Sequence, residues 1–216
     1  MSKFQEIMSA GLQPDAPAIY YKENGSIRIP QPNSPYSIRE NEFNFLETFI
    51  IENNLKSGFE LGNAFGVSTV AIGSGFKRTG GHLVSMDAYT EEKHQAYTYC
   101  GSKSDIYFDA VGYKSAKFLM REFDLEDTVD LIQGWSPNDT HIALKGRSLD
   151  FAFIDAMHND ISVVADLTSI LPFLGSHYVI FLHDVHCFSQ AVRDFVKGTF
   201  GIPYTIIPTC TLERGD

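Results

Sequence analysis

Apolar residues along this chain alternate between short continuous runs and longer segments in which they recur every three or four residues. The short runs predict strands at about 59–61, 82–87, 128–133, 149–154, 178–186 and 204–207. The periodic segments predict helices at about 37–56, 68–77, 111–123, 138–145, 161–174 and 189–200. Strands that alternate with helices in this way are typical of an α/β fold with a mostly parallel sheet covered on both faces.

The pattern divides the chain into an irregular N-terminal arm, residues 1–36, and one α/β domain, residues 37–216. The arm holds five prolines and few periodic apolar positions. Ser37 and Glu40 form a candidate capping box at the first helix of the domain. Residues 88–112 carry aromatic side chains without a regular period. This segment predicts a helical lid or insertion over a substrate pocket, with an aromatic packing layer or a dimer contact as alternatives.

Charge and cysteine content limit the classes of partner. A formal net charge of -10 disfavours nucleic acid, because binding to a phosphate backbone depends on Lys and Arg. The three cysteines, Cys100, Cys187 and Cys210, are widely spaced and form no C-x-x-C pair, so neither a disulfide framework nor a zinc site is expected. No apolar run reaches the roughly 18 residues that would span a bilayer. We therefore expect a cytoplasmic protein that acts on a small molecule, away from membranes.

The clearest motif is a short apolar strand that runs into a glycine-containing turn. Glu60 precedes the turn, Gly62 and Gly66 are separated by three residues, and Ser68 and Thr69 follow. Glycine suits such a turn because the backbone often needs a positive φ there and must let a ligand lie against it. The Ser-Thr pair can cap the next helix. The motif predicts a ligand-binding strand, turn and helix start, and the alternative is an ordinary turn.

The spacing of this motif separates two classes of cofactor. A dinucleotide-binding turn reads G-x-G-x-x-G, whereas this turn reads E-x-G-x-x-x-G-x-S. A carboxylate repels a pyrophosphate but attracts S-adenosylmethionine, which carries an ammonium and a sulfonium group. The motif resembles the first motif of class I S-adenosylmethionine-dependent methyltransferases. That resemblance implies a Rossmann-like, doubly wound, mostly parallel sheet. The chain departs from it at the end, where only residues 209–216 remain and the final β-hairpin is expected to be short or incomplete.

Acidic residues recur at the ends of the expected strands. Asp87 follows the second strand, Asp155 the fourth and Asp184 the fifth. The carboxyl ends of parallel strands meet at one edge of the sheet, so these acids are expected near one crevice. Asp87 is a candidate for binding the two hydroxyls of a ribose, or else a turn former. If the fourth and fifth strands are neighbours, roughly 4.8 Å apart, Asp155 and Asp184 can share Mg²⁺ or another divalent metal.

Residues 153–158 and 183–184 resemble a subgroup of methyltransferases that includes macrolide-sugar O-methyltransferases and cephalosporin-biosynthesis methyltransferase-like proteins. The resemblance implies that Asp155 and Asp184 bind the metal and that His158 is the general base. His183 departs from the pattern, because metal-dependent members more often have Asp, Glu or Asn there. An imidazole ligand would favour a transition metal over Mg²⁺. Each histidine taken alone is also compatible with a structural role.

The same resemblance implies which strand end binds each part of the cofactor. It implies the methionine end at the glycine turn, the ribose at Asp87 and the adenine at the turn after the third strand. There Trp135 either stacks on the purine or fills the edge of the sheet. The candidate cofactor-binding residues are Glu60, Gly62, Asn63, Gly66, Ser68, Asp87, Gly134, Trp135, Ser136 and Asp155, and the candidate catalytic residues are Asp155 and His158.

These patterns together predict an S-adenosylmethionine-dependent methyltransferase that methylates a hydroxyl group of a small molecule. A divalent metal would help because it lowers the pKa of a bound oxygen. The aromatic segment also leaves room for a homo-oligomer. Two alternatives remain, a non-catalytic cofactor-binding module and a metal-dependent hydrolase built on the Asp and His residues at 155–158 and 183–186. The hydrolase leaves the glycine turn after Glu60 unexplained.

Overall fold

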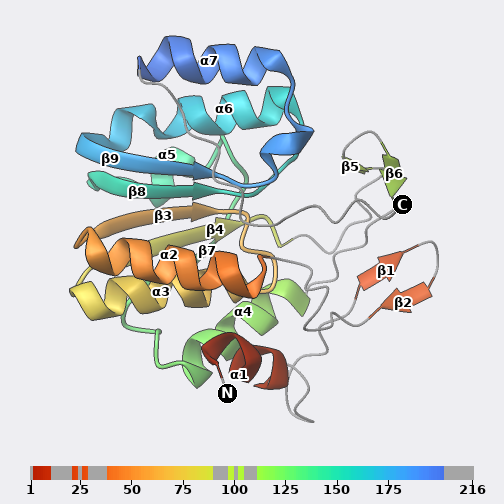
Figure 1. Ribbon diagram of the computed structural model, residues 1–216, viewed down its shortest axis with the longest axis vertical. Helices are drawn as coiled ribbons and strands as arrows, with labels where there is room; N and C mark the ends of the chain where they lie inside the picture. The colour runs from red at the N-terminus through yellow and green to blue at the C-terminus, as the bar shows by residue number, and fades with distance from the viewer. Residues whose placement is uncertain are drawn as a thin grey trace.

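A five-stranded, all-parallel sheet forms the centre of the protein. The structure is a computed structural model that describes residues 2–10, 21–23, 26–28, 38–89, 97–99, 102–104 and 111–201. The strand order is β7-β4-β3-β8-β9, and Figure 1 shows all five arrows pointing the same way. The carboxyl ends of the strands therefore share one edge of the sheet, here called the carboxyl edge. The strands are β3 (Ser57–Leu61), β4 (His82–Asp87), β7 (Val129–Gln133), β8 (Leu149–Ile154) and β9 (Leu174–Leu182).

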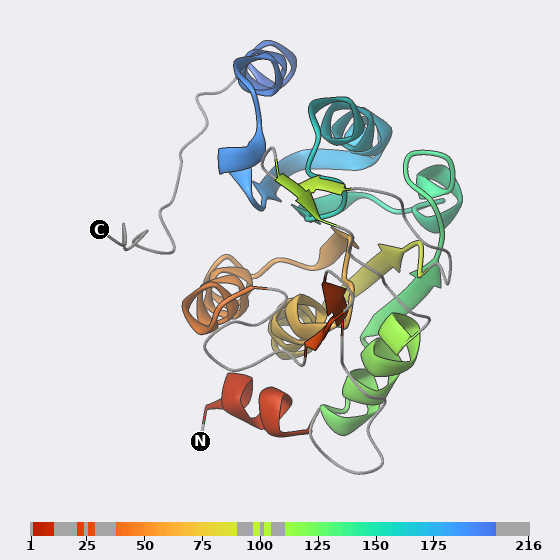
Figure 2. The ribbon, with the colours of Figure 1, turned by 90° about the vertical axis from the view of Figure 1, so that its right-hand side faces the viewer.

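Helices cover both faces of this sheet, as Figures 1 and 2 show. One apolar cluster packs α2 (Glu40–Glu52), α3 (Val67–Thr79) and α4 (Val111–Glu122) against one face. A second cluster packs α5 (Thr140–Ala143), α6 (Asp160–Ile170) and α7 (Gln190–Phe200) against the other. Along β8, Phe151 and Phe153 belong to the first cluster, whereas Ala152 and Ile154 belong to the second. The continuous apolar run of this strand is thus explained by burial on both faces, and the predicted doubly wound fold is confirmed.

The N-terminal part has more regular structure than the sequence pattern predicts. Helix α1 (Lys3–Ala10) buries Phe4 and Ile7, and the rings of Phe4 and Phe43 meet edge to face with centroids 5.9 Å apart. Strands β1 (Tyr21–Glu23) and β2 (Ser26–Arg28) form an antiparallel pair. The irregular arm predicted for 1–36 therefore contains a docked helix, which escaped detection because two buried residues are too few to set a period.

The start of helix α2 also differs from the prediction. The helix begins at Glu40, and its N-cap residue is Arg39 rather than Ser37. The Glu42 carboxylate accepts a hydrogen bond of 2.7 Å from the backbone N–H of Arg39. Glu42 therefore satisfies one of the backbone donors at the helix start, and this fixes its side chain near the first turn of α2.

Two predicted features fall largely outside the described residues. Within the predicted lid, 88–112, the described strands β5 (Tyr97–Tyr99) and β6 (Ser102–Ser104) form an antiparallel pair where a helix was expected. Residues 90–96, 100–101 and 105–110 of that insertion and the expected strand at 204–207 lie outside the described residues. Short 3-10 helices, η1 (Leu171–Phe173) and η2 (Val185–Cys187), flank β9. Strand β9 starts at Leu174, four residues earlier than the sequence indicates.

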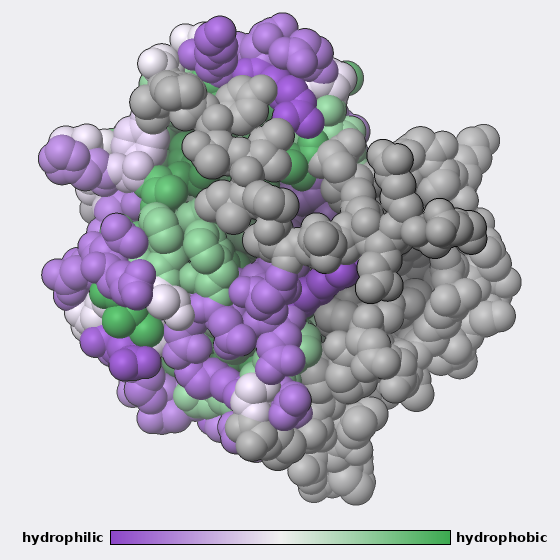
Figure 3. Space-filling view, viewed as in Figure 1, coloured by the Kyte–Doolittle hydropathy of each residue, from purple (hydrophilic) through white to green (hydrophobic). Residues whose placement is uncertain are grey.

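Helix α2 covers the outer strand β9 in part. The ring of Phe181 meets the rings of Phe45 and Phe49 edge to face, with centroids 5.7 and 5.1 Å apart. Phe45, Val179 and Phe181 are only partly buried, and Figure 3 shows an apolar area over α2 and β9 between polar regions. The contact places α2 against β9 near the end of that strand.

Two observations concern the environment of the protein. Among the described residues, no helix is both long and apolar enough to cross a bilayer. Cys187, which ends η2, is disulfide-bonded, a single bond that the spacing of the cysteines did not indicate. Spacing along the chain does not report proximity in space.

Candidate functional site

Backbone hydrogen bonds join the ends of all five strands at the carboxyl edge. The donor N–H groups lie one residue beyond β7, β3, β8 and β9, so the bonds hold the predicted site residues side by side. The bonds run from the N–H of Gly134 to the carbonyl of Asp87 (2.9 Å), from Gly62 to Met86 (2.9 Å), from Asp155 to Leu61 (2.8 Å) and from His183 to Ile154 (3.1 Å).

The glycine turn lies directly against the end of β8. Gly62 and Gly66 have φ values of 86° and 90°, a region that favours glycine. A Cβ atom at Gly62 would lie 2.3 Å from the carbonyl oxygen of Asp155, so the two backbones touch. Gly66 is the N-cap of α3 and provides no side-chain cap. The first N–H groups of α3 thus form a helix N-terminus suited to an anionic group.

Glu60 lies beneath this turn and is fully buried. Its Oε2 accepts hydrogen bonds from the hydroxyls of Thr69 (2.7 Å) and Ser85 (2.6 Å). Burial raises the pKa of Glu60 to about 7, although the hydroxyls of Ser68, Ser85 and Thr69 oppose the shift, and the charge of Asp155 raises it further. A cationic group nearby would favour the ionised carboxylate.

Three buried polar atoms near the turn have no hydrogen-bond partner among the described residues. They are Glu60 Oε1, Asn63 Oδ1 and the hydroxyl of Tyr89. The amide nitrogen of Asn63 donates to Ser85 Oγ at 2.6 Å, which leaves its carbonyl oxygen available. Buried polar atoms normally have a protein, water or ligand partner. These atoms therefore fit a ligand or water that donates hydrogen bonds, and Tyr89 joins a site to which the sequence did not assign it.

Asp87 holds the same turn from the β4 side. Its two carboxylate oxygens accept backbone N–H groups of Ala64 (2.9 Å) and Tyr89 (3.0 Å). Burial raises the pKa of Asp87, and these backbone donors lower it. Asp87 thus does organise a turn, as one interpretation of the sequence held. Because each carboxylate oxygen can accept a second bond, its predicted contact with a ribose stays a prediction.

At the end of β7, the Gly134, Trp135 and Ser136 turn is only partly enclosed. Trp135 is 47% exposed, so the interpretation of a buried tryptophan is wrong and its ring has an accessible face. The Ser136 hydroxyl donates a 2.5 Å hydrogen bond to Asp166 of α6. Burial raises the pKa of Asp166 to about 6, and the Ser136 hydroxyl opposes that shift. The turn is therefore anchored by a buried acid that the sequence did not single out.

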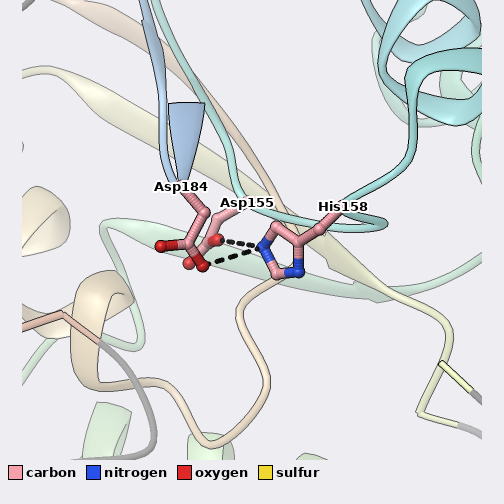
Figure 4. A group of neighbouring side chains, drawn as sticks. All are labelled: Asp155, His158 and Asp184. Carbon is pink, nitrogen blue, oxygen red and sulfur yellow. Dashed lines mark hydrogen bonds and ion pairs between the residues drawn. The ribbon is translucent and has the colours of Figure 1, made fainter. Parts of the chain in front are cut away.

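Asp155, His158 and Asp184 converge where β8 and β9 end, as Figure 4 shows. The Nε2 atom of His158 lies 3.1 Å from Asp155 Oδ1 and 3.3 Å from Asp184 Oδ2. Asp184 has a left-handed backbone with φ 48° and ψ 37°. The adjacency predicted for the fourth and fifth strands is confirmed by the parallel pairing of β8 and β9.

His183 faces the same two carboxylates. Its Nδ1 atom lies 3.1 Å from Asp155 Oδ1 and 3.6 Å from Asp184 Oδ2, and its Nε2 lies 3.4 Å from Glu42 Oε1. Burial lowers the pKa of His183, but the carboxylates of Asp155, Asp184 and Glu42 outweigh burial and hold it above the ordinary histidine value. Glu42 was missed because α2 precedes every motif, and its nearness to β9 depends on tertiary packing.

The donor set fits a divalent metal. One atom each from Asp155, His158 and Asp184 lies within 4.8 Å of the others. For metal–ligand bonds of about 2.1 Å, neighbouring ligand atoms are separated by roughly 3.0–3.4 Å, close to the distances from His158 Nε2. Two carboxylates with an imidazole suit Mn²⁺, Fe²⁺ or Zn²⁺ at least as well as Mg²⁺.

Comparison with protein families assigns the chain to a family. A family described as a methyltransferase domain matches residues 59–185, which is more than half of the chain and includes both the glycine turn and the Asp155 cluster. The chain belongs to this family. The match gives no support to the two alternatives raised from the sequence, the cofactor-binding module and the hydrolase. No curated protein sequence matches this methyltransferase.

Solved structures agree with this assignment at the level of the fold. An O-methyltransferase from Bacillus cereus, in complex with SAH, has a TM-score of 0.61 at 17% identity, and the match covers 94% of this chain and 80% of that one. TomG, an O-methyltransferase from Streptomyces achromogenes in complex with SAM, has a TM-score of 0.60 at 14% identity with the same coverage. A putative O-methyltransferase from Klebsiella pneumoniae has a TM-score of 0.59 at 16% identity, covering 93% and 78%. This methyltransferase therefore has the class I, Rossmann-like fold.

Proposed function

We propose that this methyltransferase transfers the methyl group of S-adenosylmethionine to a hydroxyl group of a small molecule, with a divalent metal at the end of β8 and β9. The observation that carries the proposal is the contact between the two halves of the site. Gly62 of the turn lies against the backbone of Asp155, whose side chain belongs to the Asp155, His158 and Asp184 cluster. A cofactor on the turn and an acceptor at the cluster would therefore be neighbours.

The proposed cofactor-binding site is built around the glycine turn. The uncapped N-terminus of α3, with Ser68 in its first turn, would receive the carboxylate of the methionine part. The unpaired oxygens of Glu60 and Asn63 match hydrogen-bond donors, which an ammonium group supplies. Asp87 would bind the ribose, and the exposed ring of Trp135 would stack on the adenine. The family and the cofactors named for the neighbouring folds support the identity of the cofactor.

The proposed acceptor site is formed by the Asp and His side chains at the ends of β8 and β9. Asp155 and Asp184 would hold the metal, which when bound lowers the pKa of the acceptor hydroxyl. The Nε2–H group of His158 donates to the carboxylates of Asp155 and Asp184, so His158 would take the hydroxyl proton at its other ring nitrogen, Nδ1. The carboxylates would then stabilise the imidazolium that forms. Methyl transfer is a direct displacement, so the remaining task of the protein is to align the two reactants and exclude water.

Calorimetry tests the cofactor assignment without an acceptor. Titration with S-adenosylmethionine and S-adenosylhomocysteine should give binding, and titration with NAD should give none. Methyl transfer to a panel of phenols, sugars and macrolide-like compounds should then be stimulated by Mg²⁺ or Mn²⁺. Binding of NAD in place of the methionine nucleosides would refute the cofactor assignment. Cofactor binding without transfer to any hydroxyl, but with transfer to an amine or a thiol, would refute O-methylation.

Several features of the prediction stay predictions. The lid at 88–112, a cytoplasmic location and a homo-oligomeric state are supported by sequence alone. Nucleic acid as acceptor remains disfavoured by the net charge of -10. The acceptor class is therefore proposed from the charge and from the Asp and His cluster together.

A further inference from the structure

We propose that His183 is a ligand of the metal through Nδ1, that Glu42 of α2 orients it, and that this pair makes the centre selective for a transition metal over Mg²⁺. The inference rests on the proposed function, since it concerns the same metal centre. It adds a residue from outside the matched family segment, 59–185, and it assigns the two histidines different tasks.

The first support is the position of the His183 ring. Its Nδ1 atom is 3.1 Å from Asp155 Oδ1 and 3.6 Å from Asp184 Oδ2. These separations are close to those between neighbouring ligand atoms around one ion with bonds of about 2.1 Å. The backbone of His183 is held by its hydrogen bond to Ile154 in the β8 and β9 ladder. The ring therefore presents one nitrogen to the carboxylates from a fixed position.

The second support is the carboxylate behind the ring. Glu42 Oε1 lies 3.4 Å from His183 Nε2, and Glu42 Oε2 is fixed by the N–H of Arg39. A histidine that binds a metal almost always donates its other ring N–H to a carboxylate, carbonyl or water, which sets the tautomer and strengthens the ligand. Glu42 supplies that acceptor. His158 leaves the strand ladder and lies in the connection to α6, which suits a group that must meet the acceptor.

The third support is chemical. Mg²⁺ prefers oxygen ligands, whereas imidazole favours Mn²⁺, Fe²⁺, Co²⁺ or Zn²⁺. Ligation by His183 would add a nitrogen to the carboxylate oxygens of Asp155 and Asp184. The pair of His183 and Glu42 therefore changes which ion the centre retains, while Asp155 and Asp184 supply the negative charge that any divalent ion requires.

Pulsed electron paramagnetic resonance on the Mn²⁺-loaded protein tests nitrogen ligation directly. Wild-type protein and the His158→Ala variant should both show coupling to an imidazole nitrogen, and His183→Asp should lose it. Calorimetry should show that Glu42→Gln lowers the affinity for Mn²⁺ relative to Mg²⁺ by about 10–100-fold. The His183→Asp variant should shift the preference toward Mg²⁺. Glu52→Gln and His177→Asp, both at exposed positions, are matched controls and should change neither quantity.

Three outcomes would overturn the inference. Nitrogen coupling that survives in His183→Asp but disappears in His158→Ala would make His158 the ligand. An unchanged ratio of metal affinities in Glu42→Gln would remove the orienting role. Failure of the folded wild-type protein to bind Mn²⁺ or Co²⁺ would show that no such centre exists. Binding of S-adenosylhomocysteine to metal-free protein is measured in parallel, so a failed metal proposal is distinguished from a failed methyltransferase proposal.

Discussion

The two halves of the carboxyl edge use acidic side chains in opposite ways. At the glycine turn, Glu60 and Asp87 are bound by hydroxyl and backbone donors of the protein itself. At the ends of β8 and β9, the carboxylates of Asp155 and Asp184 both face the imidazole rings of His158 and His183. Glu60 and Asp87 hold the backbone of the turn in place. Asp155 and Asp184 instead have carboxylate oxygens that could bind a ligand directly.

The role of an acidic residue at a strand end therefore depends on the groups that contact its carboxylate. Glu60 is fully buried and its pKa is about 7, so its charge depends on what binds above it. Asp155 and Asp184 are half-buried and share the same histidine. Substitutions in the turn should therefore alter stability, and substitutions in the cluster should alter chemistry.

The largest effect is expected from loss of the base. His158→Ala should lower the rate of methyl transfer about 10²–10⁴-fold, because no other group takes the hydroxyl proton at that position. The affinity for S-adenosylhomocysteine and the melting temperature should stay close to those of wild type. Single-turnover kinetics measures the rate, with His177→Ala as the control. A variant that retains wild-type turnover would show that His158 is not the base.

A stability effect of several kcal/mol is expected at the contact between the two halves. Gly62→Ala combines a φ of 86° with a Cβ atom 2.3 Å from the Asp155 carbonyl. Strain and overpacking together should destabilise the protein by about 3–5 kcal/mol and lower the melting temperature by roughly 10 °C.

Gly80→Ala is the matched control for this change. Gly80 has a φ of 70° but nothing within 4 Å of the added atom, so only the backbone term of about 1 kcal/mol applies. Differential scanning calorimetry compares the two variants. Equal losses of stability would mean that the close approach of Gly62 to Asp155 does not exist in solution.

The smallest effect is expected in the pH dependence of stability. Folding raises the pKa of Glu60 from 4.5 to about 7, so between these values the folded state binds the proton more tightly than the unfolded state. The stabilising contribution is complete below pH 4.5 and is lost as the pH rises through 7, by about 3 kcal/mol. Glu60→Gln cannot ionise and should therefore flatten the curve of unfolding free energy between these pH values.

Urea denaturation at several pH values checks this expectation. Comparison with wild type isolates Glu60 from Asp87 and Asp166, whose pKa values burial also raises. If wild type and Glu60→Gln show the same pH dependence, Glu60 is exposed to water in solution. That result would contradict its burial under the turn. S-adenosylmethionine should reduce the wild-type slope by favouring the ionised carboxylate.

The sequence predicted the parts of the site that depend on local pattern. The apolar run before Asp155 and the glycines after Glu60 each determine a strand or a turn within a few residues, so their placement at one edge followed from the parallel topology. Glu42 could not be found in this way, because its contact with His183 spans most of the chain. Tyr89 was seen only as one aromatic residue among several. The buried helix at Lys3–Ala10 and the bond at Cys187 likewise depend on distances that spacing in sequence does not report.

The left-handed backbone of Asp184 limits which side chains the centre can use. Asn, Asp and Gly adopt this conformation most readily, and longer side chains do so at a cost. The geometry of the main chain thus selects a short side chain at this position independently of the ion. A relative could exchange Asp184 for Asn and remove one unit of charge with little strain, whereas glutamate would disturb the turn. Variation in metal preference among such proteins is therefore expected more at position 183, which is not among the residues with a left-handed backbone, than at 184.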